Sequence, residues 1–253
     1  MAGTKILVLG GTGPAGICVI RELIYRKHEL IVYARTPSKI PSDLASNPLL
    51  EIIQGTLTSL APLTDAVSKS SSIISLLGPN IKDTSPSTLP PTLYSDFYTL
   101  LFGLMRTHSI RRILAMGTIS IKAADDKFSL LRSMVVLLMP LFFNAPYRSV
   151  LKIGEVFGEL GSGSGSGTEG GGGIDWTVFR IAGIPGGDDE ESWKKDRDEG
   201  KKGDFVGWVG EKGWVMSQRR GALARWLVDA IEGGADEWIG KMPAVAAGTV
   251  DLR

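Results

Sequence analysis

The sequence contains very little cysteine and histidine. Cys18 is its one cysteine, and His28 and His108 are its two histidines among 253 residues. A lone cysteine excludes a disulfide within the chain, which favours a reducing compartment, and we expect the cytoplasm. With so few thiol and imidazole groups, we also expect no metal site.

Long apolar runs and an excess of charge are missing too. The longest apolar stretch, residues 133–147, is shorter than the roughly 20 residues that a membrane-spanning helix needs, and it contains Pro140 and Pro146. We therefore expect a buried or capping helix over residues 128–143 and no membrane span. The net charge of +1 gives no indication of a nucleic-acid partner.

The chain does have a glycine-rich turn between an apolar run and an amphipathic segment. The stretch Lys5–Ile17 reads KILVLGGTGPAGI, with Gly10, Gly13 and Gly16 spaced three apart. In a Rossmann fold, such glycines allow a sharp turn, a close approach to a pyrophosphate, and tight helix packing, in that order. The helix dipole favours a phosphate at this point. The turn predicts a nucleotide-binding loop; the alternative is a glycine turn that binds nothing.

Apolar strand-like segments alternate with helical ones along the chain. Such alternation implies right-handed crossovers and a parallel sheet covered on both faces. We predict an α/β fold, a Rossmann doubly wound sheet with helices on both faces and a small C-terminal region covering the substrate. The expected strands are residues 6–9, 30–34, 50–54, 72–77, 111–116 and 174–180. The expected helices are residues 17–25, 60–68, 93–107, 147–160 and 219–232.

The second half of the sequence is less regular, and we treat residues 1–253 as one domain. Residues 161–173, GSGSGSGTEGGGG, predict a flexible surface linker. Residues 181–218 are expected to form a lid or appendage on the substrate side. Within it, the charged segment 186–204 is predicted to be a solvated loop, with a mobile lid carrying Trp193 as the alternative. A last short strand is possible at residues 213–217.

Four segments should meet at the carboxyl edge of the predicted sheet, where open α/β sheets bind ligands. They are residues 10–16, 35–39, 77–80 and 117–120. Arg35 stands 19 residues after Gly16 (35 − 16), where an NAD-preferring site has an acidic residue. A guanidinium instead suits the 2′-phosphate of NADP, and Lys39 adds a nearby donor. The cofactor prediction is therefore NADP(H).

Several motifs together resemble a known superfamily. They are LVLGGTGPAG, VYARTPSK, IISLLGP and RILAMGTIS, the strand IDWTVFR at residues 174–180, and SQRRGALA at residues 217–224. Over nearly the whole chain, the sequence resembles the atypical short-chain dehydrogenases/reductases. Within them it is most similar to the NmrA-like and biliverdin-reductase-B-like NAD(P)-binding proteins, and its details are similar to fungal members.

The resemblance implies a dinucleotide lying across the carboxyl edge of the sheet. It places the pyrophosphate at the glycine loop and the 2′-phosphate at Arg35. The residues after the fourth strand would line the ribose and nicotinamide, and those after the fifth strand would flank the nicotinamide. The residues implied, in that order, are Gly10, Thr12, Gly13 and Pro14; Arg35; Leu77, Gly78 and Pro79; and Thr118 and Ser120.

The sequence departs from the family where catalysis is concerned. The superfamily's Tyr-x-x-x-Lys pair is replaced by Tyr147 and Lys152, which are one residue further apart. Residues i and i+4 share a helix face, whereas i+5 is rotated well away from it. The candidate proton donors are Tyr147, Ser120 and Thr118, with Lys152 as an electrostatic helper. Alternatively, Tyr147 packs on the core and the two hydroxyls close a strand end. Thr56 stands where many members have an aspartate near the adenine.

Three hypotheses on function follow from these observations. The first is an NADPH-dependent reductase of a small, apolar carbonyl, enone or quinone metabolite. The second is a non-catalytic NADP(H)-sensing regulator, and the third is an isomerase or cyclase that reuses the fold. The expected partner is a small-molecule substrate, with the chain as a monomer or homodimer. For Arg180, at the end of the sixth predicted strand, we favour a structural ion pair over a contact with an acidic substrate.

Overall fold

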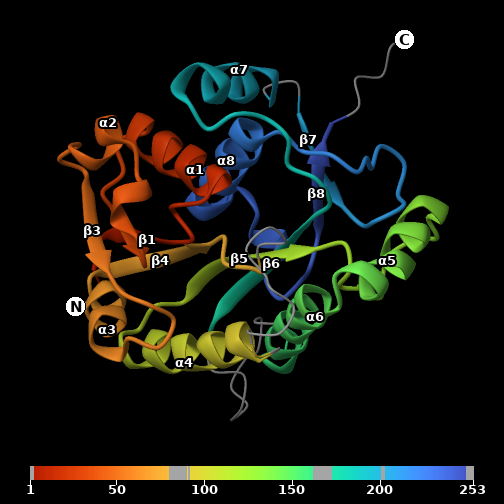
Figure 1. Ribbon diagram of the computed structural model, residues 1–253, viewed down its shortest axis with the longest axis horizontal. Helices are drawn as coiled ribbons and strands as arrows, with labels where there is room; N and C mark the ends of the chain where they lie inside the picture. The colour runs from red at the N-terminus through yellow and green to blue at the C-terminus, as the bar shows by residue number, and fades with distance from the viewer. Residues whose placement is uncertain (1–2, 80–89, 91, 162–172, 201–202, 249–253) are drawn as a thin grey trace.

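The computed structural model describes residues 3–79, 90, 92–161, 173–200 and 203–248. Its centre is an eight-stranded sheet in the order β3-β2-β1-β4-β5-β6-β8-β7, with helices on both faces (Figure 1). This is the α/β fold that the alternation predicts. The strands are β1 (Lys5–Leu9), β2 (Leu30–Ala34), β3 (Leu50–Gln54), β4 (Ser70–Ser75), β5 (Arg112–Thr118), β6 (Asp175–Ile181), β7 (Asp204–Gly207) and β8 (Ala244–Ala247).

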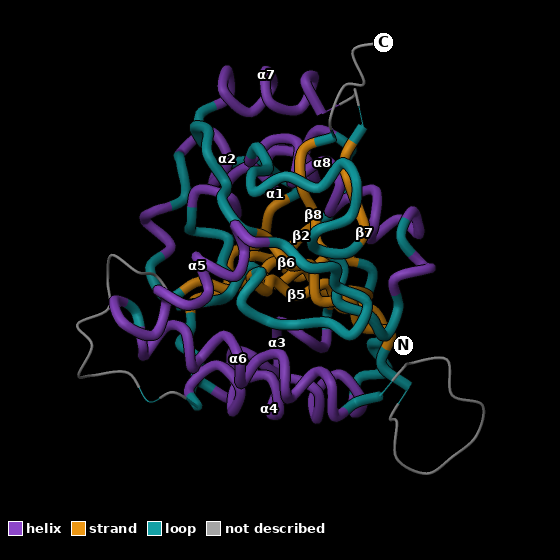
Figure 2. The backbone as a smooth tube through the Cα atoms, turned by 90° about the vertical axis from the view of Figure 1, so that its right-hand side faces the viewer, coloured by secondary structure: helices purple, strands orange, loops and turns teal. Residues whose placement is uncertain are grey.

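The helices form two layers, one on each side of the sheet (Figure 2). Helices α1 and α8 cover one face with α7 outside them, and α3, α4 and α6 cover the other. The helices are α1 (Pro14–Tyr25), α2 (Ser42–Ala45), α3 (Leu60–Ser68), α4 (Leu93–Thr107), α5 (Leu130–Phe142), α6 (Asn144–Glu159), α7 (Glu190–Gly200) and α8 (Arg220–Asp229). Shorter helical turns occupy Pro37–Lys39, Ala230–Gly234 and Asp236–Trp238.

The first strand shows why an unbroken apolar run forms the middle of this sheet. Side chains of a strand point alternately to its two faces. Ile6 and Val8 accordingly join the core beneath α1 and α8, whereas Leu7 and Leu9 join the core beneath α3, α4 and α6. Parallel pairing of β1 with both β2 and β4 places its carboxyl end between theirs. The glycine loop therefore starts at the centre of the ligand-binding edge.

The far edge of the sheet corrects two predictions. The sheet is not wholly parallel, because β7 pairs antiparallel with β8. The strand expected at residues 213–217 is absent; the described part of that segment has a single bridge, between Gly183 and Ser217. Both missed strands have only four residues, and β8 is the small-residue sequence AVAA, so neither carries a strong alternating pattern.

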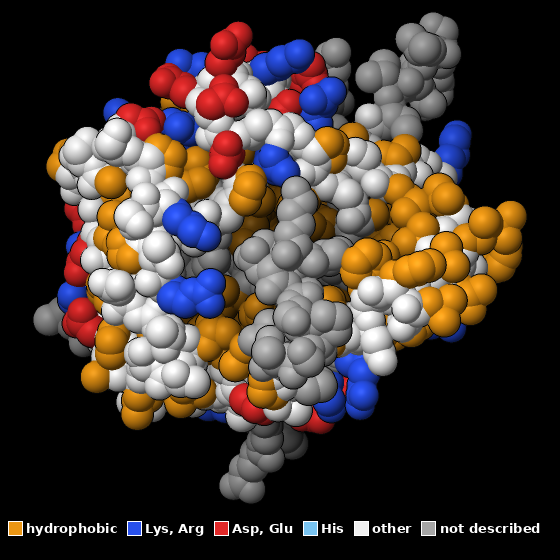
Figure 3. Space-filling view, in the orientation of Figure 1, with side chains coloured by type: hydrophobic (Ala, Val, Ile, Leu, Met, Phe, Trp, Pro, Cys, Tyr) orange, Lys and Arg blue, Asp and Glu red, His pale blue; other side chains and the backbone are white. Residues whose placement is uncertain are grey.

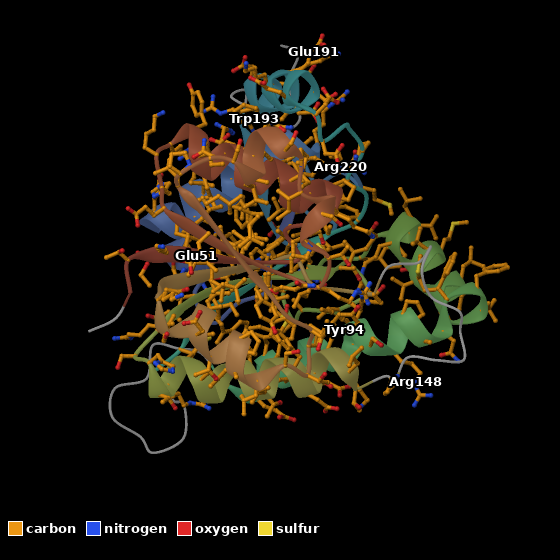
Figure 4. All side chains as sticks on the ribbon, turned by 60° about the vertical axis from the view of Figure 1, so that its left-hand side comes forward. Glu51, Tyr94, Arg148, Glu191, Trp193 and Arg220 are labelled. Carbon is orange, nitrogen blue, oxygen red and sulfur yellow. The ribbon has the colours of Figure 1, made fainter. Side chains whose placement is uncertain are left out.

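The C-terminal region corrects a third prediction. Residues 190–200 form helix α7, not a solvated loop, and it packs on α1 and α8. Trp193 is buried and meets Tyr25 of α1 edge to face at 5.7 Å between ring centroids, and Figure 4 shows it directed from α7 toward α1. Arg197 reaches the buried Glu22 of α1 at 2.7 Å. The linker expected at residues 161–173 falls almost entirely outside the described residues, as do residues 80–89 and 91 of the loop that follows β4.

Of the two expectations for helix α5, a buried or a capping helix, the first is wrong. None of its residues is buried, although 11 of its 13 are apolar. No single helix among the described residues is long and apolar enough to cross a membrane. Helices α5 and α6 reach the necessary length and apolar composition only when taken together, and the chain bends by 120° between them.

Candidate functional site

The three glycines of the first turn have different steric surroundings. Gly10 has a φ of +77°, and a Cβ there would lie 2.9 Å from the carbonyl group of Leu76. A Cβ on Gly16 would lie 2.6 Å from Cα of Gly11 and would also collide with the Gly10 carbonyl oxygen. A Cβ on Gly13 would meet nothing closer than that same oxygen at 3.6 Å. The fold itself requires Gly10 and Gly16, whereas the described residues leave the space beside Gly13 open.

The open space lies at the N-terminus of α1. Gly13 is the N-cap, no side chain caps this terminus, and Pro14 occupies the first turn, with the amide of Ile17 bonded to the Gly13 oxygen at 2.9 Å. The first amides of a helix have no partner within the helix. Thr12 is half-buried beside them. Uncapped amides, the positive end of the helix dipole and an open approach are the requirements of a phosphate site.

The end of β2 presents positive charge next to this loop. Arg35 directly follows the strand, and its exposed guanidinium forms no ion pair or side-chain hydrogen bond with the described residues. Lys39 ends the next helical turn and is likewise exposed. No acidic residue lies between β2 and α2 before Asp43, which is engaged by Arg21 at 2.7 Å. The arrangement provides free cationic donors beside the glycine loop.

A tyrosine that the sequence did not single out holds this edge together. The hydroxyl of Tyr33 donates to the carbonyl oxygen of Thr56 at 2.7 Å, with the Ser59 oxygen at 3.2 Å. Its ring lies so close to Gly55 that a Cβ there would overlap it. Thr56 itself hydrogen-bonds to Thr58 and Ser59. Thr56, which stands where the resemblance would imply an aspartate, is thus part of a local network of hydroxyl groups.

The segments after β4 and β5 form the next two parts of the edge. Leu77, Gly78 and Pro79 are half-buried, and a Cβ on Gly78 would lie 3.3 Å from Cε of Met116 on β5. A Cβ on Gly10 would lie 3.2 Å from the Leu77 amide nitrogen, so the glycine loop and this segment are in contact. Asn80, the last residue of the expected segment, lies outside the described residues.

Thr118 and Ser120 form a tight turn at the end of β5. The amide of Ser120 donates to Thr118 Oγ1 at 3.2 Å, and the amide of Ile121 donates to the Thr118 oxygen at 3.0 Å. Both side chains are half-buried. The turn is held from the neighbouring strand as well, because the Ile119 amide donates to the Ile181 oxygen at 3.1 Å. The main chain of this turn and the Thr118 hydroxyl are therefore held at the edge where the other predicted segments end.

Tyr147 and Lys152 lie on α6 but not on the same side of it. Five residues at 3.6 per turn separate them by about 140° around the axis. Tyr147 lies two turns before Gly154, whose Cα packs so closely on Ile121 that a Cβ would sit 2.9 Å from that side chain. Lys152 instead points to the outside, where its ammonium is 3.9 Å from Glu155. Tyr147 is thus on the side of α6 that faces the end of β5, and Lys152 is not.

The ion pair expected for Arg180 is confirmed, and its partner is Asp126. Both guanidinium NH groups donate to the carboxylate at 2.7 Å, and both residues are almost fully buried. Further donations from Arg180 reach the carbonyl oxygens of Met242 and Ile121. Burial alone would raise the pKa of Asp126, but the hydrogen bonds from Arg180 outweigh it and hold this pKa below its ordinary value of 3.8. This charge is engaged entirely within the protein.

A second basic residue near this edge escaped the sequence analysis. Arg132, the one charged residue in α5, donates through Nε to the carbonyl oxygen of Ile119 at 2.9 Å. A single charge in an otherwise apolar helix was the available signal. Its contact connects the first turn of α5 to the turn that carries Thr118 and Ser120.

The face of the molecule that contains this edge is hollowed. Figure 3 shows a depression with hydrophobic side chains inside it, Lys and Arg side chains along one side, and the projecting apolar helix α5 on the other. The described strand ends β2, β1, β4 and β5 are consecutive in the sheet, so the segments that follow them adjoin one another. Open glycine amides, free cations and apolar walls together suit a dinucleotide.

The comparison with known families decides the general assignment. Residues 10–139, just over half of the chain, match the family described as NAD(P)H-binding. The chain belongs to the NAD(P)H-binding family. The matched region contains the glycine loop, Arg35, the end of β4 and the end of β5, and therefore covers the whole candidate edge except α6.

Solved structures share the fold of this NAD(P)H-binding protein at low sequence identity. A short-chain dehydrogenase/reductase from Veillonella parvula, solved in complex with NADP, has 14% identity and a TM-score of 0.68, covering 97% of this chain and 95% of its own. A Rossmann-fold NAD(P)-binding family protein from Shigella flexneri has 15% identity, a TM-score of 0.59 and 99% coverage of both chains. The oxidoreductase ylbE from Lactococcus lactis has 13% identity, a TM-score of 0.60 and coverages of 97% and 92%.

The fold and the family together confirm the prediction of an NAD(P)H-binding Rossmann protein. The residues fit the cofactor: the uncapped first turn of α1 and the open side of Gly13 would hold the pyrophosphate. Arg35 and Lys39 would meet the adenosine end, while the segments after β4 and β5 would border the nicotinamide end.

Proposed function

We propose that the protein is an NADPH-dependent oxidoreductase that reduces a small, apolar carbonyl, enone or quinone metabolite. The observation that carries the choice of NADPH is the exposed Arg35, which directly follows β2 and has no carboxylate partner in the described part of the chain. A guanidinium can bind a 2′-phosphate through two parallel hydrogen bonds, whereas the ribose 2′-hydroxyl of NADH calls for an acceptor at this place.

The cofactor and the protein would have the roles that they usually have in a nicotinamide-dependent enzyme. The bound cofactor supplies the hydride, and the protein positions the substrate and provides a proton. Tyr147 is the favoured donor because it lies on the side of α6 that packs on Ile121, just after the β5 turn. Thr118 and Ser120 would hold the substrate oxygen by hydrogen bonds. Lys152 is a poor helper, since its ammonium is turned toward Glu155.

The apolar character of the substrate is supported by what surrounds the β4 and β5 ends. Leu77 and Met116 are half-buried at this edge, and Figure 3 shows hydrophobic side chains in the depression. The nearest buried charge, Arg180, is already saturated by Asp126 and by main-chain oxygens. An acidic substrate would find no free buried cation there among the described residues.

The orientation of Lys152 supports a second candidate function. Because Lys152 is turned toward Glu155 and away from Tyr147, the protein could bind NADP(H) without turning over, as a sensor of the NADP(H) redox state in the manner of the NmrA-like proteins that it resembles. The finer family placement, the cytoplasm as compartment and a monomer or homodimer stay predictions that accompany the proposal.

The test begins with binding and then asks for turnover. Tryptophan fluorescence should report tighter binding of NADPH than of NADH, and NADPH oxidation should follow with at least one member of a panel of quinones, enones and aldehydes. Tyr147→Phe should lower kcat by about 10²–10⁴-fold at unchanged NADPH affinity, as expected for loss of a proton donor. Tyr25→Phe, which removes a hydroxyl on the exposed end of α1, is the matched control.

The outcomes separate the candidates. Binding of neither nucleotide would contradict the proposal in both forms. Tight NADPH binding without oxidation across the panel would favour the sensor. Turnover that survives Tyr147→Phe would remove this tyrosine from its role and leave Ser120 and Thr118 as the proton-donating candidates.

A further inference from the structure

Helix α5 presents an apolar face to the outside of the molecule. Its most exposed side chains recur every three or four residues, so they lie along one side of the helix. The exposed Phe128, just before the helix, adds to this apolar surface. The exposed side chains within the helix are Leu130, Leu131, Met134, Leu137, Leu138, Leu141 and Phe142, with Leu137 and Leu141 exposed by 72% and 74%. Contiguous apolar surface of this kind marks a site of interaction, whereas scattered exposed leucines do not.

The helix stands off from the body and is attached at its ends. Figures 1 and 3 show it projecting at the edge of the molecule, with its outer side apolar. Arg132 holds its first turn to the Ile119 oxygen, and Ser129 caps it by accepting from the Arg132 amide. Thirteen residues at 1.5 Å each give a length of about 20 Å. This is shorter than the roughly 30 Å hydrocarbon core of a bilayer, so α5 is suited to lie along a membrane surface and not to cross it.

Within residues 127–148, which contain the apolar face, all charged side chains are basic. From Lys127 to Arg148 the chain has three basic residues, the third being Arg132, and no acidic one. Lys127 and Arg148 are exposed on either side of the helix, and Figure 4 shows Arg148 pointing away from the body. Of the two carboxylates just before Lys127, Asp126 is buried and neutralised by Arg180, whereas Asp125 is exposed. An apolar face flanked by exposed basic residues complements an anionic lipid surface, which attracts such residues.

A second copy of the chain fits this surface less well. A symmetric dimer would bring the same patch of each copy together. The basic residues Lys127, Arg132 and Arg148 of the two copies would then be brought near one another, and residues 127–148 contain no acidic residue that could pair with them across the interface. The apolar surface alone would suit either occupant, and the charge distribution favours the membrane.

We propose that α5 docks this protein on an anionic membrane surface, with Leu137 and Leu141 among the inserted side chains and Lys127 and Arg148 at the lipid headgroups. The hydrophobic effect provides the insertion energy, and the basic residues provide the preference for anionic lipid. Since Arg132 joins α5 to the turn of Thr118 and Ser120, docking would bring the candidate substrate edge to the membrane. The docking itself is independent of the proposed oxidoreductase activity.

The experiment is flotation of the full chain with vesicles of phosphatidylcholine alone or with 30% phosphatidylglycerol. We expect the wild type to float with the anionic vesicles and to float less at high salt, because salt screens the headgroup attraction. Leu137→Asp combined with Leu141→Asp should reduce the bound fraction at least ten-fold. Both side chains are mostly exposed, so the variant should keep its unfolding midpoint. Arg148→Glu should weaken binding to the anionic vesicles only.

The control is Leu60→Asp, because Leu60 on α3 is 53% exposed and far from α5 in the fold; it should float like the wild type. Absence of flotation with either vesicle would overturn the proposal. So would a concentration-dependent dimer in light scattering that the paired α5 substitution abolishes, since a second copy would then be the occupant. Neither result depends on whether NADPH is oxidised.

Discussion

Two arginines on the ligand-binding side of the sheet have opposite surroundings. Arg35, after β2, is exposed and without an ionic partner among the described residues. Arg180, in β6, is fully buried and donates to Asp126, Met242 and Ile121. One guanidinium is available to a ligand, and the other is part of the protein's own framework.

The contrast extends to the segments around them. Beside Arg35, the described groups include open amides at the start of α1 and an exposed Lys39. Around Arg180, the Asp126 carboxylate also accepts from the amides of Ala123 and Val209, so that one ion pair fixes the loops after β5 and after β7. The N-terminal half of the edge is therefore suited to binding, and the C-terminal half is stabilised by internal charge pairing.

The largest expected effect comes from breaking the buried pair. Asp126→Asn should lower the free energy of unfolding by about 3–5 kcal/mol, because it leaves the Arg180 charge buried without a counter-charge. Urea denaturation measures it. Asp65→Asn, which breaks the exposed pair with Lys69, is the matched control and should have a much smaller effect. Equal effects of the two substitutions would contradict a structural role for Arg180.

The same pair predicts a pH dependence. When folding lowers the pKa of a carboxyl group, the ionised group stabilises the protein at pH values above its unfolded-state pKa. This contribution is lost as the pH falls through the pKa of the folded state. The pKa of Asp126 is held below 3.8 by the hydrogen bonds from Arg180, despite burial. The difference in unfolding free energy between wild type and Asp126→Asn should thus be largest above pH 4 and shrink as the pH falls below 3.8. A difference that grows on acidification would be the wrong sign.

The next effect concerns the free arginine. Arg35→Asp should weaken NADPH binding by about 10–100-fold, the range expected for loss of charge-assisted hydrogen bonds of about 1.5–3 kcal/mol. NADH should bind no more weakly than before, since a carboxylate can accept from the ribose 2′-hydroxyl. Titrations at fixed ionic strength compare the two nucleotides. The control is Arg106→Asp, at the opposite end of the sheet on α4; an equal loss there would mean that only net charge matters.

Much of this architecture could be predicted because it rests on local pattern. The bounds of β2, β3, α3 and α4 are those expected from apolar periodicity and turn residues. The glycine loop and Arg35 were recognisable because their roles depend on position within one strand–turn–helix unit. The family match supports the cofactor class on the same stretch.

What the sequence could not provide depends on contacts distant in the chain or on exposure. Asp126 lies 54 residues before Arg180, and no periodicity links them. Helix α5 was expected to be buried since apolar residues are usually inside, yet apolar composition does not by itself decide which surface a helix faces. Helix α7 contains both acidic and basic residues, a composition typical of a solvated segment. Its Arg197 nevertheless forms an ion pair with the buried Glu22 of α1. In each case the deciding partner is elsewhere in the chain.

The smallest change, one methyl group, distinguishes binding from framework within the glycine loop itself. Gly13→Ala should cost at most about 1 kcal/mol of stability, because Gly13 has a φ of −84°, which alanine adopts, and open space for a Cβ. Gly16→Ala should cost about 1–3 kcal/mol, because its methyl would be forced against the main chain of Gly10 and Gly11. Gly103→Ala, on α4, is the control and should be stabilising, because the added Cβ would meet no described atom within 4 Å apart from the backbone of its own helix and its chain neighbours.

Nucleotide titration then completes the comparison. If the open side of Gly13 is where the pyrophosphate approaches, Gly13→Ala should lose at least ten-fold in NADPH affinity while its unfolding curve stays close to that of the wild type. Gly103→Ala should bind normally. A folded Gly13→Ala that binds NADPH as tightly as the wild type would show that the open space is not used by the cofactor, and the phosphate would then have to be held by the cations after β2 alone.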